Sequence, residues 1–227
     1  MIYKKHKQMF FDLGQNVDIA KQVKFYGGYT IPEEIERGIA VDLGSNIGLF
    51  SLENHENFKE IFTVEASYWN FISGLDNIRR CKINNVKCFN LAAGKSTGEV
   101  IKIYQNGYNS VSATTSADML KINNKDEGSE PYHNVLSISL EGMFDFFGLN
   151  YVDFMKIDIE GAEYDFLLDK DLSNIASMGI EIHGTFGEEK KTLLKNHLSK
   201  YFEVYDVKYD DKSPGHSVIT YLNKTKF

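Results

Sequence analysis

Cysteine is scarce in this chain of 227 residues, which contains two, Cys81 and Cys88. Two thiols predict no disulfide framework, and reduced cysteines are typical of a cytoplasmic protein. Long apolar runs are lacking as well, because no stretch approaches the roughly 20 residues that a membrane-spanning helix needs. The basic N-terminal segment has no apolar run behind it, which excludes a typical secretion signal. We therefore expect a cytoplasmic protein without a membrane span.

An excess of positive charge is also missing. The chain has 32 acidic and 25 basic residues, which gives a formal net charge of −7. A protein that grips a phosphate backbone or an anionic membrane usually presents the opposite balance. The composition therefore disfavours a nucleic-acid partner, although it does not exclude a local basic patch.

Strands and helices alternate regularly from Gly38 to the end of the chain. The length fits one α/β domain, with residues 1–37 as an N-terminal extension of the same domain and 38–227 as its body. The alternation predicts a mostly parallel seven-stranded sheet with helices on both faces and an antiparallel hairpin at one edge. Along the whole chain, strand segments are expected at 39–43, 61–66, 86–93, 135–140, 151–161, 178–184, 201–207 and 217–223. A further, exposed strand is expected at 98–105.

Three other segments carry specific expectations. Residues 32–37 resemble a short helix with Pro32 in its first turn. Residues 67–84 are expected to form a helix whose apolar face includes Trp69, which we place in the core. The polar segment 106–134 is long for a loop inside a compact domain, and such loops are usually functional or disordered. Tyr108, near its start, is the aromatic residue that we expect to contact a substrate; the other candidates for a sugar or ring site are Tyr26, Tyr29, Trp69 and Tyr104.

The segment "IAVDLGSNIGLF", residues 39–50, is a strand that turns sharply into a helix. It is no phosphate-binding loop, because Leu49 and Phe50 stand where a lysine and a hydroxyl residue are needed. It also lacks the dinucleotide fingerprint, because Asn46 and Leu49 replace two of its glycines. The remaining pattern, with Asp42 ahead of the turn, suits a ligand that has an amino acid at one end.

Glu65 ends the second strand, 23 residues after Asp42. A carboxylate at this point of such a fold can accept hydrogen bonds from both hydroxyls of a ribose. The alternative is a solvated acid that caps the following helix. Together with the turn, Glu65 favours a ligand with a ribose and an amino acid, and S-adenosylmethionine has both.

Six motifs then occur in the order seen in FkbM-type methyltransferases: "VDLGSNIGLFSL", "FTVEASYWNF", "CFNLAAGKSTGEV", "NGYNSVSA", "FMKIDIEGAEYDFL" and "IEIHG". The chain resembles this family from about residue 38 to about residue 198. The resemblance implies a Rossmann-like class I fold and S-adenosylmethionine as the cofactor. It also implies a set of cofactor contacts, with Ser45 and Ala66 contributing by their backbone and Ala92 lying at the adenine: Asp42, Gly44, Ser45, Asn46, Glu65, Ala66 and Ala92.

Acids and one histidine follow the central strands. Asp158 and Glu160 come after one strand, while Glu181 and His183 lie two apart on the next and should point to one face. We take Asp158, His183 and Glu160 as the catalytic candidates and Glu181 as a further substrate contact. Either His183 or Asp158 is a general base, or Asp158, Glu181 and His183 hold a divalent cation, which we favour less. The plainer alternative is that Glu160 and Glu163 complement a helix N-terminus and His183 bonds to backbone.

The favoured function is O-methylation of a hydroxyl on a sugar, a glycan or a small metabolite. An RNA methyltransferase of the same fold is an alternative, but the charge balance argues against it. An NAD-dependent oxidoreductase of the short-chain type needs a Tyr-x-x-x-Lys pair after the core strands, and Tyr3 and Lys7 stand before them. A cofactor-binding module without catalysis is the last alternative, which Asp158 and His183 weakly oppose.

Overall fold

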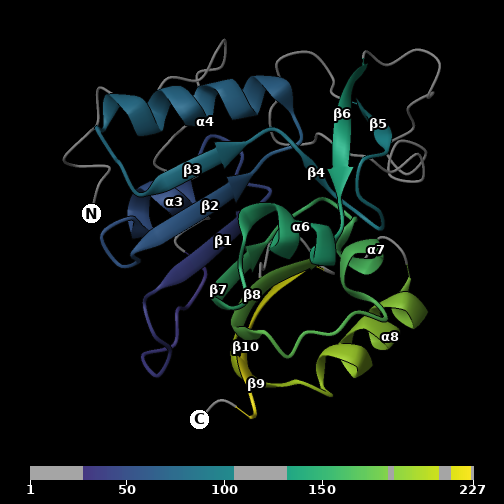
Figure 1. The fold of residues 1–227 in the computed structure, drawn as a ribbon. Helices are drawn as coiled ribbons and strands as arrows, with labels where there is room; N and C mark the ends of the chain where they lie inside the picture. The colour runs from purple at the N-terminus through teal and green to yellow at the C-terminus, as the bar shows by residue number, and fades with distance from the viewer. Residues whose placement is uncertain (1–27, 105–131, 184–186, 210–215, 226–227) are drawn as a thin grey trace.

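The computed structural model describes residues 28–104, 132–183, 187–209 and 216–225 (Figure 1). Tyr26, Tyr108 and most of the segment 106–134 therefore lie outside the described residues, so the predictions that rest on them stay predictions. None of the helices in the described part of the chain has the length and apolar character needed to cross a membrane.

Seven strands form the main sheet, in the order β3-β2-β1-β7-β8-β10-β9. Within the described residues β10 runs antiparallel to both of its neighbours, and the other pairs are parallel. The predicted mostly parallel sheet with an antiparallel edge is confirmed. The strands are β1 (Ile39–Leu43), β2 (Glu60–Val64), β3 (Val86–Phe89), β7 (Val152–Ile157), β8 (Ile175–His183), β9 (Phe202–Tyr209) and β10 (His216–Asn223).

The strand order reverses at β1, which lies between β2 and β7. In open α/β sheets a ligand site forms at such a reversal, beyond the carboxyl ends of the strands. The register places Asp42 of β1 directly beside Lys156 of β7 on one side and beside Thr63 of β2 on the other. The end of β1 therefore brings Asp42 and Lys156 to the same level of the same face.

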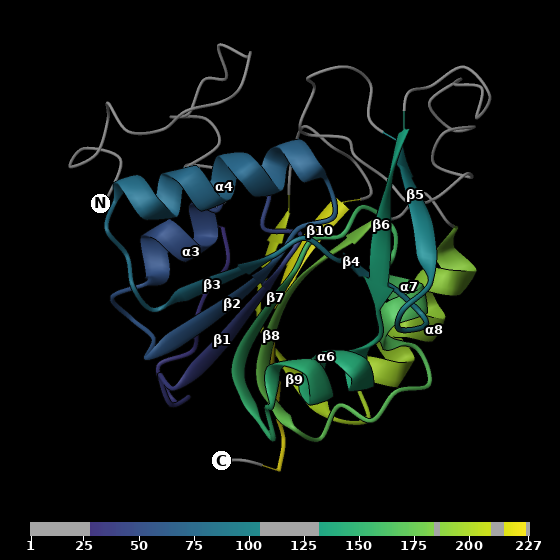
Figure 2. The same ribbon diagram turned by 45° about the horizontal axis from the view of Figure 1, so that its top comes forward.

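Helices cover both faces of the sheet (Figure 2). The helices α3 (Leu49–Asn54) and α4 (Tyr68–Arg80) lie on one face. The helices α6 (Leu140–Phe147), α7 (Glu163–Leu167) and α8 (Glu188–Leu198) lie on the other. Successive residues of a central strand point to opposite faces of the sheet and pack in two different cores. Met155 belongs to the larger core, with α6 to α8, whereas Phe154 stacks on Phe50 of α3 in the other.

A small second sheet has the order β4-β6-β5. Its strands are β4 (Ala92–Ala93), β5 (Val100–Tyr104) and β6 (Tyr132–Ile138). The single strand expected at 86–93 is thus divided between two sheets. The end of the expected loop, residues 132–134, belongs to β6, because it pairs with β5 in an antiparallel ladder.

The prediction that Trp69 lies in the core is wrong, since its side chain is 48% exposed. The buried face of α4 is polar and small instead: it consists of Asn70, Ser73, Gly74, Asn77 and Ile78. The cause is a close approach of backbones. A Cβ on Gly74 would lie 3.2 Å from the carbonyl oxygen of Asn46, and Asn77 Nδ2 donates to the carbonyl of Ile47 at 3.0 Å. The helix therefore packs against the first turn through small residues, and its bulky ring faces outward.

Residues 28–37 pack against the sheet without the helix expected at 32–37, where the backbone forms turns. Ile35 is buried in the core that contains Phe154. Tyr29 fills the space above Gly179, where an added Cβ would lie 2.7 Å from its ring. This part of the N-terminal extension thus covers the strands next to the carboxyl end of β7.

Candidate active site

The turn after β1 is held by three backbone hydrogen bonds. The amides of Gly44 and Ser45 donate to the carbonyl of Val64 at 2.9 and 3.1 Å, and Gly48 N donates to Ser45 O at 2.8 Å. Gly44, Asn46 and Gly48 all have positive φ, which explains glycine and asparagine at these positions. At Gly44 the approach is extreme, because a Cβ would lie 1.7 Å from the carbonyl oxygen of Asp158. The turn therefore abuts the segment after β7.

Glu65 connects this turn to the start of α4. Its Oε2 accepts from the backbone N–H of Asn46 at 2.8 Å, and its Oε1 accepts from that of Ser67 at 2.8 Å. Burial raises the pKa of the Glu65 carboxyl, and these two hydrogen bonds oppose that rise. Ser67 in turn accepts from Asn70 N and so caps α4. Each carboxylate oxygen keeps a further lone pair, so the backbone contacts leave acceptor capacity at Glu65.

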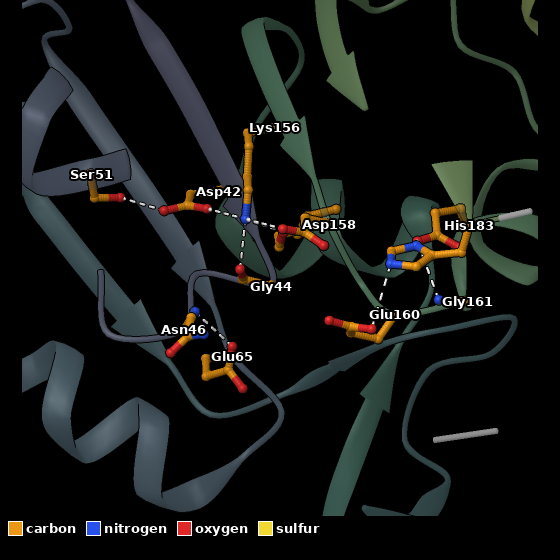
Figure 3. A network of polar contacts seen from close by, with 12 residues as sticks. Asp42, Gly44, Asn46, Ser51, Glu65, Lys156, Asp158, Glu160, Gly161 and His183 are labelled. Atoms are coloured by element: carbon orange, nitrogen blue, oxygen red, sulfur yellow. Dashed lines mark hydrogen bonds and ion pairs between the residues drawn. The ribbon is translucent and has the colours of Figure 1, made fainter. Parts of the chain in front are cut away.

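Asp42 is fully buried, so its carboxylate contacts neighbouring side chains (Figure 3). Oδ2 accepts from Ser51 Oγ at 2.8 Å, and Oδ1 lies 3.4 Å from Lys156 Nζ. Burial raises the pKa of Asp42, while the charge of Lys156 works against the rise. The predicted cofactor contact at Asp42 stays a prediction. The contacts observed connect β1 to α3 through Ser51 and to β7 through Lys156.

Sequence reasoning missed Lys156, a side chain that is 1% exposed. Burial disfavours its charge, but the carboxylates of Asp42 and Asp158 outweigh burial and raise its pKa. The available signal was a single lysine within an apolar strand that leads into an acidic segment. A buried lysine requires such acceptors, because an unpaired charge inside a protein is strongly unfavourable.

The three catalytic candidates come together at the carboxyl ends of β7 and β8. Ligating atoms of Asp158, Glu160 and His183 all lie within 4.8 Å of one another. His183 Nε2 lies 3.5 Å from Glu160 Oε2 (Figure 3). Its Nδ1 lies 2.7 Å from Glu163 Oε1. Glu163 also accepts from the backbone N–H of Gly161 at 3.2 Å. His183 is therefore held between two carboxylates, which the alternative of a backbone-bonded histidine does not describe.

The charges of this cluster shift two pKa values. Burial, together with the nearby acids Asp158, Glu181 and Glu163, raises the pKa of Glu160 to about 8, although the charge of His183 opposes the rise. Burial alone would lower the pKa of His183, but the hydrogen bond and charge of Glu163, with Glu160 and Asp158, raise it to about 10. At neutral pH the imidazole is therefore charged, and Glu160 is the group that titrates near the working range.

Glu181 is buried on β8 and acts on this cluster through its charge, as the pKa of Glu160 shows. The metal-ligand set expected at Asp158, Glu181 and His183 stays a prediction. Among the described residues, the candidate ligand atoms that lie within reach of one another belong to Asp158, Glu160 and His183. Glu160 has a left-handed backbone, with φ of 52°.

The backbone groups expected at the cofactor already have protein partners. The Ala66 carbonyl accepts from Asn90 Nδ2 at 3.1 Å and lies 3.1 Å from Nε2 of His133, a residue that sequence reasoning missed. Ala92 is buried and packs with Ile103 and Val135 in the core of the small sheet. His133 lies in β6, which pairs with Ala92 of β4, so no local pattern in the sequence could place it beside Ala66.

The order of the seven strands, with antiparallel β10 inserted beside the edge strand, is that of the class I S-adenosylmethionine-dependent methyltransferase fold. Residues 42–222 match the model of the methyltransferase FkbM domain, and the chain belongs to this family. The family and the cofactor inferred from the motifs are thereby confirmed. No protein of curated function matches the chain in sequence.

Solved structures with a similar fold share little sequence with this protein. A fibrillarin in complex with Nop5p has 14% identity and a TM-score of 0.50, with 88% of this chain and 79% of that chain covered. M. capricolum TrmK, solved with S-adenosyl-homocysteine, has 12% identity and a TM-score of 0.47, with 91% and 69% covered. A putative RNA methyltransferase from Pyrococcus horikoshii has 12% identity and a TM-score of 0.48, with 98% and 99% covered. At such low identity, structural likeness concerns the fold.

Proposed function

We propose that this protein transfers the methyl group of S-adenosylmethionine to a hydroxyl of a sugar, a glycan or a small metabolite. The observation that carries the proposal is the cluster of Asp158, Glu160 and His183 at the carboxyl ends of β7 and β8. It abuts the first turn, because Gly44 packs against the carbonyl of Asp158. A proton acceptor thus lies beside the turn to which we assign the methyl donor.

The residues present suit a cationic cofactor. Around the turn and the cluster, the acids outnumber the bases: Lys156 and His183 face Asp42, Glu65, Asp158, Glu160, Glu163 and Glu181. An excess of buried negative charge favours a ligand that carries a sulfonium and an ammonium group. Glu65, with its remaining acceptor capacity, would bind the ribose hydroxyls, and the segment from Gly44 to Asn46 would hold the amino-acid end.

Glu160 is the group we assign as the general base. Its side chain is 33% exposed, whereas that of His183 is 3% exposed, so an acceptor hydroxyl can reach Glu160 more readily. With a pKa of about 8, Glu160 becomes charged, and so able to take a proton, as the pH rises toward 8. When bound, S-adenosylmethionine would supply an electrophilic methyl group for transfer to the acceptor oxygen, with its sulfur as the leaving group. The hydroxyl proton passes to Glu160.

His183 and Glu163 position this base. Glu163 holds Nδ1 of the imidazole at 2.7 Å, which turns Nε2 toward Glu160. The charged imidazole limits how far the pKa of Glu160 rises. Asp158 belongs to the same cluster and would orient the acceptor through a donor group other than that hydroxyl.

The direct test is transfer of labelled methyl groups from S-adenosylmethionine to a panel of acceptors. The panel contains free sugars, sugar nucleotides, glycans and small hydroxylated metabolites, with tRNA and rRNA transcripts as the comparison. We expect label in a hydroxylated small molecule or a glycan, as an ether that survives alkaline hydrolysis. Label confined to RNA, or released by alkali as methanol from a methyl ester, would contradict the proposal.

A further inference from the structure

Lys156 is a buried lysine at the point where the two halves of the site meet. It lies on β7 beside Asp42 of β1, and its other neighbour in the register is Gly179 of β8. Because Gly179 has no side chain, Tyr29 occupies that space, and its ring centre lies 5.8 Å from Lys156 Nζ. The ammonium group is thus enclosed by the sheet and by Tyr29.

The ammonium contacts the cofactor side of the site through backbone carbonyls. Lys156 Nζ donates to the Gly44 carbonyl at 2.6 Å and lies 3.3 Å from that of Leu43. These carbonyls belong to the turn that continues to Asn46, whose N–H bonds to Glu65. A hydrogen bond from a charged donor is stronger than a neutral one, so Lys156 fixes where this turn lies.

The same ammonium reaches the acceptor side. Its distance to Asp158 Oδ2 is 3.9 Å, and that to Asp42 Oδ1 is 3.4 Å (Figure 3). Asp158 follows β7 and belongs to the cluster with Glu160 and His183. One ammonium group therefore contacts both the turn assigned to the methyl donor and an acid assigned to the methyl acceptor. The turn follows β1 and the acid follows the neighbouring strand β7.

We propose that Lys156 is a positioning residue for methyl transfer, which keeps the cofactor turn at Gly44 in register with Asp158. Its role on the acceptor side rests on the proposed function above, whereas its role at the turn depends on cofactor binding alone. The observation behind this role is the short hydrogen bond from Nζ to the Gly44 carbonyl. A lysine that only balanced the charge of Asp42 could make that bond without any effect on cofactor binding, so cofactor affinity separates the two roles.

Two variants and their combination distinguish these roles. Lys156→Met keeps the apolar stem but removes the charge, and Asp42→Asn removes its buried counter-charge. Lys156→Met is expected to lower the melting temperature strongly, because Asp42 is then buried without a counter-ion. The double variant removes both charges and is expected to recover most of that loss. The matched control is Lys170→Met, since Lys170 pairs with Glu141 at 3.0 Å on α6.

Affinity for S-adenosylhomocysteine, measured by calorimetry, is the deciding quantity, and it requires no knowledge of the acceptor. We expect the folded double variant to bind at least about tenfold more weakly than Asp42→Asn alone, because the Gly44 carbonyl has lost a charged donor. Lys170→Met should bind as the natural protein does. A double variant with recovered stability and the same affinity as Asp42→Asn would overturn the proposal and leave Lys156 as a counter-ion.

Turnover with an acceptor found in the labelling panel tests the second half of the role. The double variant is expected to lose turnover by more than saturation with cofactor can restore, because Asp158 has lost its neighbour. If saturating cofactor restores full turnover, Lys156 acts on the donor side alone. If no acceptor is found, the proposed function fails while the affinity measurement still decides the role of Lys156 at the turn.

Discussion

Nδ1 of His183 lies 2.7 Å from Oε1 of Glu163, and both side chains are withdrawn from solvent. A histidine and a glutamate buried at this distance share a proton in a charge-assisted hydrogen bond. The bond makes the imidazole a permanent cation near neutral pH and leaves proton transfer to the more exposed Glu160.

Stability should fall as the pH rises through the range in which His183 loses its proton. Its pKa is about 10 in the folded protein against an ordinary 6.5, so its stabilisation is complete below about pH 6.5 and disappears as the pH passes through about 10. The raised pKa of Glu160, about 8 against 4.5, acts in the same direction between those values. Melting temperatures of the natural protein and His183→Gln should therefore converge toward pH 10.

His197→Gln is the control for that measurement. His197 is also buried, but its Nε2 contacts the carbonyl of Lys170 at 3.0 Å and meets no carboxylate there. The variant therefore reports the loss of a buried imidazole without the acids that surround His183. Parallel curves for both histidine variants would mean that the acids around His183 leave its proton affinity unaltered.

Turnover should rise with pH up to about 8, because Glu160 accepts a proton only in its charged form. Glu160→Gln should lower turnover by about 100-fold or more, a typical contribution of general-base catalysis. It should also remove the rising limb of the curve of turnover against pH. Affinity for S-adenosylhomocysteine should stay near that of the natural protein. Retention of the limb in Glu160→Gln would assign the base elsewhere, to Asp158 first.

Glu65→Ala should weaken both the fold and the cofactor site. The substitution leaves the N–H groups of Asn46 and Ser67 without their acceptor, and each such buried group costs about 1–3 kcal/mol. Cofactor affinity should fall in addition, which calorimetry measures at a temperature where the variant is folded. Glu60→Ala is the control, because Glu60 pairs with Lys87 at 2.6 Å at the far end of β2. Equal cofactor affinity in the two variants would exclude Glu65 from the ribose site.

Gly44→Ala should be far more harmful than Gly98→Ala, although both glycines have positive φ, of 71° and 85°. At Gly98 an added Cβ meets nothing within 4 Å, so the change costs about 1–2 kcal/mol of backbone strain. At Gly44 the Cβ would also meet the carbonyl of Asp158, and the displacement adds about 1–3 kcal/mol. Chemical denaturation measures both losses. Similar values would mean that the turn can move away from β7 freely.

The fold followed closely from the sequence because its central strands are continuous apolar runs bounded by turn residues. The Gly44 turn and Glu65 were found for the same reason, since each stands at the end of such a run. Lys156 was missed because its partners depend on how β1 and β7 align, and these strands lie more than 100 residues apart. Trp69 was misplaced because a helix that contacts backbone closely needs small side chains, which invert the usual apolar face.

Trp69 is the one tryptophan of the chain, and it stands two positions after Ser67, whose N–H bonds to Glu65. Its indole meets Tyr68 edge to face at 5.3 Å and remains open to water. Under excitation that tyrosine does not absorb, emission therefore comes from one place, the first turn of the helix whose start bonds to Glu65. S-adenosylhomocysteine should shift or quench that emission and NAD⁺ should not, so the chain contains a built-in optical probe for its own cofactor and needs no attached dye.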